Sequence, residues 1–258
     1  MSKGKMKWLI GGAVAAVAVA ALAGAALYYT LGSDDAPAQA NITSAVSTLN
    51  ATQSATSGST QGTTPTEAAA TSATADDLAG TWVLAADGES FVGYRVQEEL
   101  AGFGTFTAVG RTQGVEATMA FDGSTITDVQ VTADLTGLTS DNSMRDGQLK
   151  RQGLETDTYP TATFVLTEPI ELDGVPTDGE TVEATAIGDL TLHGVTRSIS
   201  IPLEGQFTNG YAVIVGSLDI TFADYEIPTP SSARVLSIED RGVMELQMVF
   251  EQATTTNG

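Results

Sequence analysis

Alternation of apolar and polar residues is the feature that most constrains how this chain can fold. From about Leu78 to Gln252 the alternation recurs in short segments bounded by glycines, which is the pattern of half-buried strands. Asp122-Gly123 and Asn209-Gly210 lie between such segments and favour hairpin turns. The predicted strands span residues 91–97, 114–121, 126–135, 161–170, 181–193, 195–203, 211–222 and 243–250. Strands spaced in this way predict an antiparallel sandwich or barrel.

Residues 188–204 show this alternation most clearly and predict a β-hairpin around His193-Gly194. The apolar positions of its two strands are Leu190, Leu192, Ile199, Ile201 and Leu203. They share one face because successive strand residues point to opposite sides, so this face requires a core. His193 precedes the turn glycine, and we interpret it as a structural residue rather than a catalytic one.

One segment interrupts the series of strands. Residues 139–158 lack a β-branched run, and Ser140 or Asp141 is placed to cap the beginning of a helix. Gly153 is placed to end that helix, and Pro160 prevents its continuation. We therefore expect a single short helix that lies across an otherwise all-β domain.

The N-terminal residues 8–31 contain no charged residue. As a helix with a rise of about 1.5 Å per residue they would span roughly 36 Å, enough to cross a hydrocarbon core of about 30 Å. Lysines precede the segment and Asp34 and Asp35 follow it, so the positive-inside rule places residues 1–7 in the cytoplasm. The sequence thus predicts a single-pass protein of the cell membrane whose C-terminal domain is extracytoplasmic.

A cleaved signal peptide is the alternative interpretation of this segment. Ala-x-Ala patterns occur at residues 23–25 and 38–40. The apolar part of a signal peptide is usually about 7 to 15 residues long, which is shorter than this run. We therefore favour a retained membrane anchor.

Residues 32–77 are rich in Ser, Thr and Ala and show few bulky apolar residues. Such a composition predicts a disordered linker, because it buries too little apolar surface to offset the entropy of ordering. A flexible tether of this length has a typical span of about 35 to 40 Å. The folded domain is expected over residues 78–252, followed by a disordered tail at 253–258.

Composition excludes several classes of function. The formal net charge is −21, and all 32 acidic residues follow Ser33, which argues against nucleic-acid binding. The chain has no cysteine and one histidine, which excludes disulfides, thiolate chemistry and multi-histidine metal sites. A hydrolase that uses only carboxylates stays formally open, but with so many acids some pair always satisfies the required spacing.

Three motifs in the strand-rich region carry a resemblance to a known family. They are Ser90-x-Val92-x-Tyr94-x-Val96, then Arg145-Asp146-x-x-Leu149 followed by Tyr159-Pro160-x-x-x-Phe164, and finally Gly188-x-Leu190-Thr191-Leu192-x-Gly194-x-Thr196-Arg197. Their order and spacing resemble the YceI family over essentially all of residues 80–251. Gln148 and Gly153-Leu154 depart from the commoner motif, in which histidine and a Phe-Phe pair are frequent at these positions.

The resemblance implies a lipocalin-like antiparallel barrel closed by one short helix, with a long isoprenoid chain held in its interior. Arg145 and Asp146 are expected to fix the helix to the barrel. Pattern alone leaves a filled core and a hollow barrel open, and the resemblance favours the hollow one. The predicted ligand-binding residues are Tyr94, Arg95, Arg111, Phe164, Leu166, Leu190, Leu192, Ile199, Ile201, Ile214, Leu218, Met244 and Leu246.

Arg95 and Arg111 are the charged members of this set. A guanidinium group matches a pyrophosphate or a quinone oxygen, so both are candidates for the barrel mouth. The alternative is that they point outward and pair with carboxylates.

The function expected from the sequence is that of a membrane-tethered extracytoplasmic lipid-binding protein. Its partners would be the membrane and an apolar lipid, an isoprenoid or a quinone, with no metal, no nucleic acid, no other cofactor and no enzymatic activity. A structural or protein-interaction barrel with a filled core and no ligand is the alternative.

Overall fold

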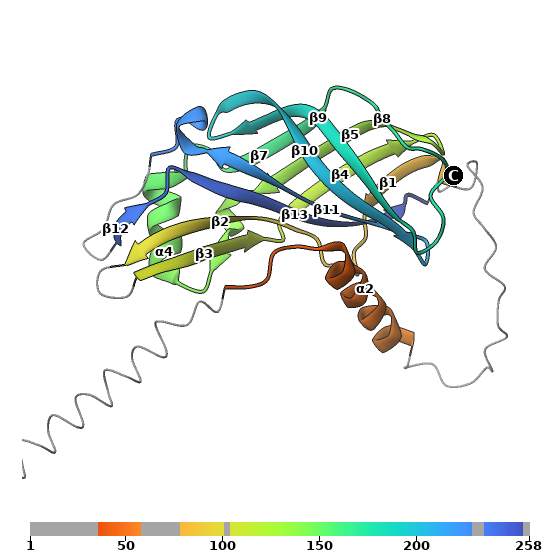
Figure 1. Ribbon diagram of the computed structural model, residues 1–258, viewed down its shortest axis with the longest axis horizontal. Helices are drawn as coiled ribbons and strands as arrows, with labels where there is room; N and C mark the ends of the chain where they lie inside the picture. The colour runs from red at the N-terminus through yellow and green to blue at the C-terminus, as the bar shows by residue number, and fades with distance from the viewer. Residues whose placement is uncertain (1–35, 58–77, 101–103, 229–234, 255–258) are drawn as a thin grey trace, which may run out of the picture.

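The computed structural model describes residues 36–57, 78–100, 104–228 and 235–254 (Figure 1). An antiparallel β-barrel dominates it, with helices at one end and on the outer wall. The strands are β1 Gly80–Leu84, β2 Phe91–Leu100, β3 Gly104–Thr112, β4 Val115–Phe121, β5 Thr125–Asp134, β6 Thr139–Ser140, β7 Thr161–Leu166, β8 Ile170–Glu171, β9 Thr181–Leu192, β10 Val195–Thr208, β11 Tyr211–Thr221, β12 Val235–Ile238 and β13 Arg241–Gln252. The helices are α2 Ile42–Ser57, α4 Ser143–Gln148, the π-helix η2 Leu149–Gly153, and the 3₁₀ turns η1 Leu135–Gly137 and η3 Phe222–Tyr225.

Eight of the described strands close the barrel in the order β1, β4, β5, β7, β9, β10, β11, β13 and back to β1. β13 makes the closure possible because its two halves pair with different strands. Its C-terminal half pairs with β1 through Phe250 and Leu84, and its N-terminal half pairs with β2 through Val243 and Arg95. The β2–β3 hairpin therefore replaces β1 beside β13 at the other end of the barrel, where α4 also lies (Figure 1).

The predicted strands correspond to described strands, and segment 161–170 divides into β7 and β8. The sequence did not predict β1, β3, β6 and β12. β6 pairs at only two positions, and β12 is four residues long, so neither is long enough to show a period. β3 contains glycine or threonine at most of its positions, which hides its alternation.

Two hairpins have the turns that the sequence predicted. His193 and Gly194 both have positive φ, 52° and 76°, as do Asn209 and Gly210, 51° and 84°. Positive φ at both central residues is the requirement of a type I′ turn, whose twist matches that of the flanking strands. The β9–β10 pairing continues from the His193-Gly194 turn over the full length of β9.

The helical interruption is confirmed, with different end residues. Asn142 rather than Ser140 or Asp141 caps α4, because its Oδ1 accepts hydrogen bonds from the amides of residues 144 and 145, at 3.0 and 3.3 Å. At the C-terminal end the left-handed residue is Glu155, with φ of 47°, and not Gly153, which lies in the π-helix η2.

Helix α2 contradicts the predicted disorder of the linker 32–77 over residues 42–57, whereas residues 32–35 and 58–77 lie outside the described residues. Ile42, Ala45 and Leu49 form a buried stripe on one face of α2 and pack on the outside of the barrel. On the barrel side the cluster consists of Ala85, Val213, Val215 and Val249. Asn41 caps the helix, since its Oδ1 accepts a hydrogen bond from the amide of residue 44 at 2.9 Å. The stripe is small, which is why the sequence showed no clear period.

Among residues 36–57, 78–100, 104–228 and 235–254, no helix combines the length and the apolar character needed to cross a membrane. The predicted spanning segment 8–31, residues 1–7, which were predicted to be cytoplasmic, and most of the tail 253–258 lie outside these ranges.

Gly188→Ala is expected to destabilise the barrel because β7 and β9 approach each other closely at this position. A Cβ atom on Gly188 would lie 2.4 Å from the Val165 carbonyl oxygen and 2.5 Å from the Phe164 ring. Overpacking of this kind costs about 1 to 3 kcal/mol, because the backbone must shift. Urea denaturation of the purified protein measures the loss.

The matched control is Gly205→Ala on the neighbouring strand β10. A Cβ atom there would meet its nearest atoms at 3.9 Å, which is ordinary van der Waals contact. This variant should keep wild-type stability, and an equal loss in both variants would contradict the close approach at Gly188.

Candidate functional site

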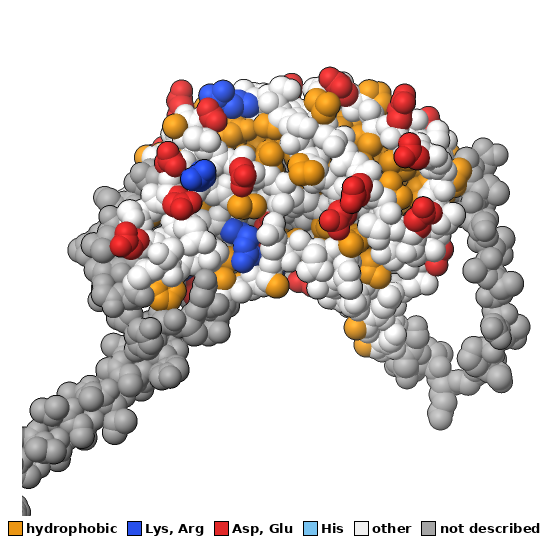
Figure 2. All heavy atoms as spheres, in the orientation of Figure 1, with side chains coloured by type: hydrophobic (Ala, Val, Ile, Leu, Met, Phe, Trp, Pro, Cys, Tyr) orange, Lys and Arg blue, Asp and Glu red, His pale blue; other side chains and the backbone are white. Residues whose placement is uncertain are grey.

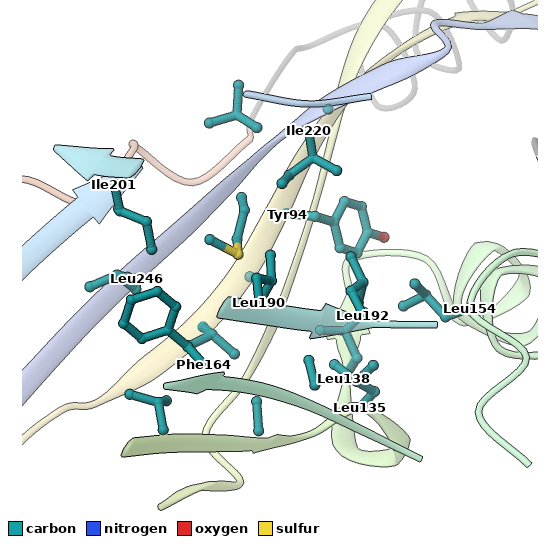
Figure 3. Close-up of a pocket in the computed structure, with 18 of the residues that line it drawn as sticks. Tyr94, Leu135, Leu138, Leu154, Phe164, Leu190, Leu192, Ile201, Ile220 and Leu246 are labelled. Atoms are coloured by element: carbon teal, nitrogen blue, oxygen red, sulfur yellow. The ribbon is translucent and has the colours of Figure 1, made fainter. Parts of the chain in front are cut away.

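The barrel encloses a cavity of about 930 Å³. Small-molecule sites in proteins have volumes of about 300 to 1,000 Å³, so this one lies near the upper end of that range. Aliphatic and aromatic side chains from opposite walls line it, and in Figure 3 Phe164, Leu190 and Tyr94 converge on the same space. A second, smaller cavity of about 90 Å³ borders it near Trp82 and Phe207.

Strand alternation explains the apolar lining. On β13, Met244, Leu246 and Met248 face the cavity, and the intervening Glu245 faces the outside of the barrel. The same alternation places Phe164 of β7 inside and leaves Val165 44% exposed. Alternation therefore gives these strands an apolar inner face, and the main apolar patch of the outer face, at Val213, Val215 and Val249, is covered by α2.

The polar part of the lining lies where α4 crosses the barrel end. Glu98 of β2 is 7% exposed, and its Oε1 lies 3.3 Å from the Arg145 Nε. Arg145 Nη1 also donates a hydrogen bond to Asp141 Oδ1 at 2.6 Å. Burial alone would lower the pKa of Arg145, but the carboxylates of Glu98 and Asp141 outweigh it and raise this pKa. The guanidinium is thus a fully charged link between α4 and β2.

A second link joins α4 to β6. Asp146 Oδ1 accepts hydrogen bonds from the Ser140 hydroxyl at 2.6 Å and from the Ser140 amide at 3.0 Å. The expectation that Arg145 and Asp146 fix the helix to the barrel is confirmed by these contacts.

Tyr94 lies between the cavity and α4. Its ring covers Gly110 on the neighbouring strand β3, where a Cβ atom would lie 2.4 Å from the ring. The Tyr94 hydroxyl is buried and makes no hydrogen bond within the described residues. Burial raises the pKa of this hydroxyl, with a smaller opposing effect from Arg145, so it stays protonated.

Arg95 and Arg111 do not line the cavity, which corrects the prediction that they meet a ligand at the barrel mouth. Both point outward to Glu245, whose side chain is fully buried, at 3.6 and 2.8 Å. Their remaining donors bind the chain before α2: Arg95 Nη1 donates to the Pro37 carbonyl at 2.8 Å and Arg111 Nη2 to the Ala38 carbonyl at 2.7 Å. The outward-facing alternative therefore describes both arginines.

His193 is a structural residue, as predicted. It is 6% exposed, its Nδ1 lies 3.1 Å from the Tyr225 carbonyl oxygen and its Nε2 lies 3.2 Å from Glu155 Oε2. The Tyr159 ring packs against the imidazole with a centroid distance of 4.4 Å. These contacts join the β9–β10 turn to η3 and to the segment that follows η2.

The outer surface is acidic. Figure 2 shows carboxylate side chains scattered over one face of the molecule, with fewer basic groups among them. This face offers no continuous basic stripe of the kind that phosphate backbones require.

Comparison with known proteins identifies the family. The sequence matches the YceI-like domain over residues 82–250, which is most of the described barrel. The chain belongs to the YceI-like family. Residues 36–57, including α2, precede the YceI-like domain and pack on its outer wall.

Relatives of the YceI-like domain include proteins of the genus Vibrio. The UPF0312 protein VPA0850 of Vibrio parahaemolyticus is 30% identical over 141 residues, which cover 50% of this chain and 70% of that protein. The UPF0312 protein VVA0736 of Vibrio vulnificus is 30% identical over 118 residues, which cover 43% of this chain and 59% of that protein.

A solved structure shares the fold. It is that of a polyisoprenoid binding domain from Saccharophagus degradans, with a TM-score of 0.52 and 18% sequence identity. The similarity covers 68% of this chain and 99% of that domain. The likeness supports the eight-stranded antiparallel barrel with short helices described above.

The structure places most of the predicted ligand-binding residues of this YceI-like domain around the cavity. The residues that line it are Tyr94, Phe164, Leu190, Leu192, Ile201, Ile214, Met244 and Leu246. Leu166, Ile199 and Leu218 pack in the adjoining core without lining it. Ligand binding itself stays a prediction for all of them.

Sequence reasoning missed the polar members of the lining. Arg145 was assigned to helix anchoring alone, and Gln148 was noticed only as a departure from the family motif. Glu98 carried no signal in the sequence, because it lies in β2 among other acidic and amide residues. Alternation along β2 puts its side chain on the inner face with Tyr94 and Val96, but the predicted strand 91–97 ended one residue before it.

Proposed function

We propose that this YceI-like protein binds an isoprenoid-type lipid in its barrel and acts as a membrane-tethered extracytoplasmic lipid-binding protein. The observation that carries the proposal is the apolar cavity of about 930 Å³. The similar fold of the Saccharophagus degradans polyisoprenoid binding domain supports an apolar ligand.

Burial of the lipid chain supplies the binding energy. Each methylene group removed from water contributes about 0.8 kcal/mol. A water molecule takes about 30 Å³ in the liquid and a chain methylene is of similar size, so the cavity has room for roughly thirty chain carbons. Chains of such length bind tightly through apolar contact alone, without a charged anchor.

The apolar run at residues 8–31 supports the membrane tether, and the lysines before it support an extracytoplasmic barrel. A barrel held beside a membrane is close to the phase in which isoprenoid lipids reside. The location and the proposed ligand are therefore consistent with each other.

The alternatives have less support. A filled core does not fit the cavity, so a purely structural barrel is not favoured. For a hydrolase that uses two carboxylates, the described cavity lining contains one, Glu98, and this side chain is paired with Arg145.

Native mass spectrometry of the full chain, released from detergent, tests the proposal. We expect an adduct of apolar mass that organic extraction removes. A protein with no adduct that also takes up no added C20 isoprenoid would disprove the function.

Met244→Trp is expected to reduce lipid occupancy at least about tenfold, because the larger side chain enters the cavity from β13. Val165→Trp is the matched control, since Val165 is 44% exposed on the outside of β7. Adduct intensity in native mass spectra measures both. Equal occupancy in the two variants would place the lipid outside the barrel.

A further inference from the structure

The polar end of the cavity has a definite charge balance. Glu98 lines the cavity, and its carboxylate lies against Arg145, the cation among the described lining residues. Arg145 is shared with a second carboxylate, Asp141, at 2.6 Å. Asp146 adds a third carboxylate in the same cluster through its bonds to Ser140. Two carboxylates thus pair with the one guanidinium of the described cavity lining, and a third is linked to it through the Ser140 hydroxyl.

This balance opposes a negatively charged head group. A phosphate or diphosphate placed near Arg145 would have to displace Glu98 or Asp141, and it would then lie beside the displaced carboxylate. Burial of an anion without a free cationic partner is strongly unfavourable. Arg95 and Arg111 offer no substitute, because they face Glu245 on the outside of the barrel.

Gln148 gives the same end of the cavity a neutral hydrogen-bonding group. It follows Arg145 by three residues, almost one helical turn, and its side chain lines the cavity. Within the described residues the Gln148 amide has no hydrogen-bond partner, so its N–H groups and its oxygen are both available. A primary amide can donate to a carbonyl or hydroxyl oxygen and accept from a hydroxyl group.

We infer that the cavity selects lipids whose polar end is uncharged, such as an isoprenoid alcohol or quinone, and rejects the corresponding diphosphates, with Gln148 binding the head group. The inference rests on the proposed function and deepens it. Specificity arises because the acidic cluster around Arg145 repels an anion, whereas the apolar chain contributes equally to both kinds of ligand.

A competition between two lipids with the same C20 chain tests the inference. The full chain is mixed with equal amounts of geranylgeraniol and geranylgeranyl diphosphate, and native mass spectrometry measures the ratio of the two adducts. We expect the alcohol adduct to exceed the diphosphate adduct at least about tenfold. A ratio near one, or a preference for the diphosphate, overturns the inference but leaves the proposed function intact.

Glu98→Gln should reverse part of this selectivity. The substitution keeps an acceptor for Arg145 but removes the negative charge, so the guanidinium becomes available to an anionic head group. We expect the ratio of diphosphate adduct to alcohol adduct to rise about tenfold in the competition, with uptake of the alcohol alone unchanged. Since both ligands compete in one sample, an effect on folding would lower both adducts and leave their ratio unchanged. An unchanged ratio in a folded variant overturns the charge argument.

Gln148→Leu tests the neutral contact separately. This variant should lose most of its preference for geranylgeraniol over a C20 hydrocarbon of the same branching, a preference that the wild type shows. Gln113→Leu, at an exposed position in the β3–β4 turn, is the matched control and should keep the preference. A preference retained by Gln148→Leu overturns the role of the amide. Failure of every C20 ligand to bind wild-type protein would overturn the proposed function itself.

Discussion

Glu245→Gln is expected to lower the free energy of unfolding by about 3 kcal/mol. The Glu245 side chain is fully buried and is the shared partner of Arg95 and Arg111, which are 17% and 27% exposed. Removal of its charge leaves two partly buried guanidinium groups without a carboxylate. For a domain of this size, the melting temperature should fall by roughly 6 to 12 °C, which differential scanning calorimetry measures.

Glu239→Gln is the matched control for this prediction. Glu239 pairs with Arg241 at 3.7 Å, and both side chains are at least half exposed. Exposed pairs of this kind contribute about 0 to 1 kcal/mol, so the control should melt close to wild type. Equal losses in the two variants would show that the buried cluster has no special role.

Leu49→Asp should detach α2 from the barrel. Leu49 is 2% exposed and packs against Val213, Val215 and Val249, and a carboxylate in this contact would be buried without a partner. Undocking costs less than burial of the charge, so we expect the helix to leave the wall. Amide hydrogen exchange over residues 42–57 should then accelerate by about tenfold or more, the rate rise that a loss of about 1.4 kcal/mol produces.

The effect should extend to the barrel, because Pro37 and Ala38 bind Arg95 and Arg111 just before α2. Thr48→Asp, on the exposed face of the same helix, is the control and should leave exchange over residues 42–57 unchanged. Unchanged exchange in Leu49→Asp would mean that the helix is held by the Arg95 and Arg111 contacts alone.

The barrel was predictable because its signals are local. Alternation along β9 and β10 and the turn at His193-Gly194 depend only on neighbouring residues, and the structure follows them. The closure of the ring was not predictable in detail. It depends on a change along β13, whose N-terminal half pairs with β2 and whose C-terminal half pairs with β1. The apolar pattern of the β13 sequence does not show where this change occurs.

The sequence predicted those residues of the candidate site whose inward orientation follows from strand alternation. It did not predict those whose position depends on an ion pair with a residue far away in the sequence. Phe164, Leu190 and Met244 were found because apolar residues on an alternating strand face inward. Arg95 and Arg111 were misplaced because their partner, Glu245, lies far away in the sequence. Glu98 was missed for the same reason, since its role depends on Arg145, 47 residues later.

The docking of residues 37–57 changes the mechanics of the proposed tether. A tether that is disordered from residue 32 to 77 would hold the barrel at a typical distance of about 35 to 40 Å from its attachment point. If residues 8–31 span a membrane, only the five residues from 32 to 36 separate the bilayer from the contact of Pro37 with Arg95, a reach of about 20 Å. Such a short attachment would restrict both the distance and the orientation of the barrel, with its β2–β3 wall kept beside the bilayer.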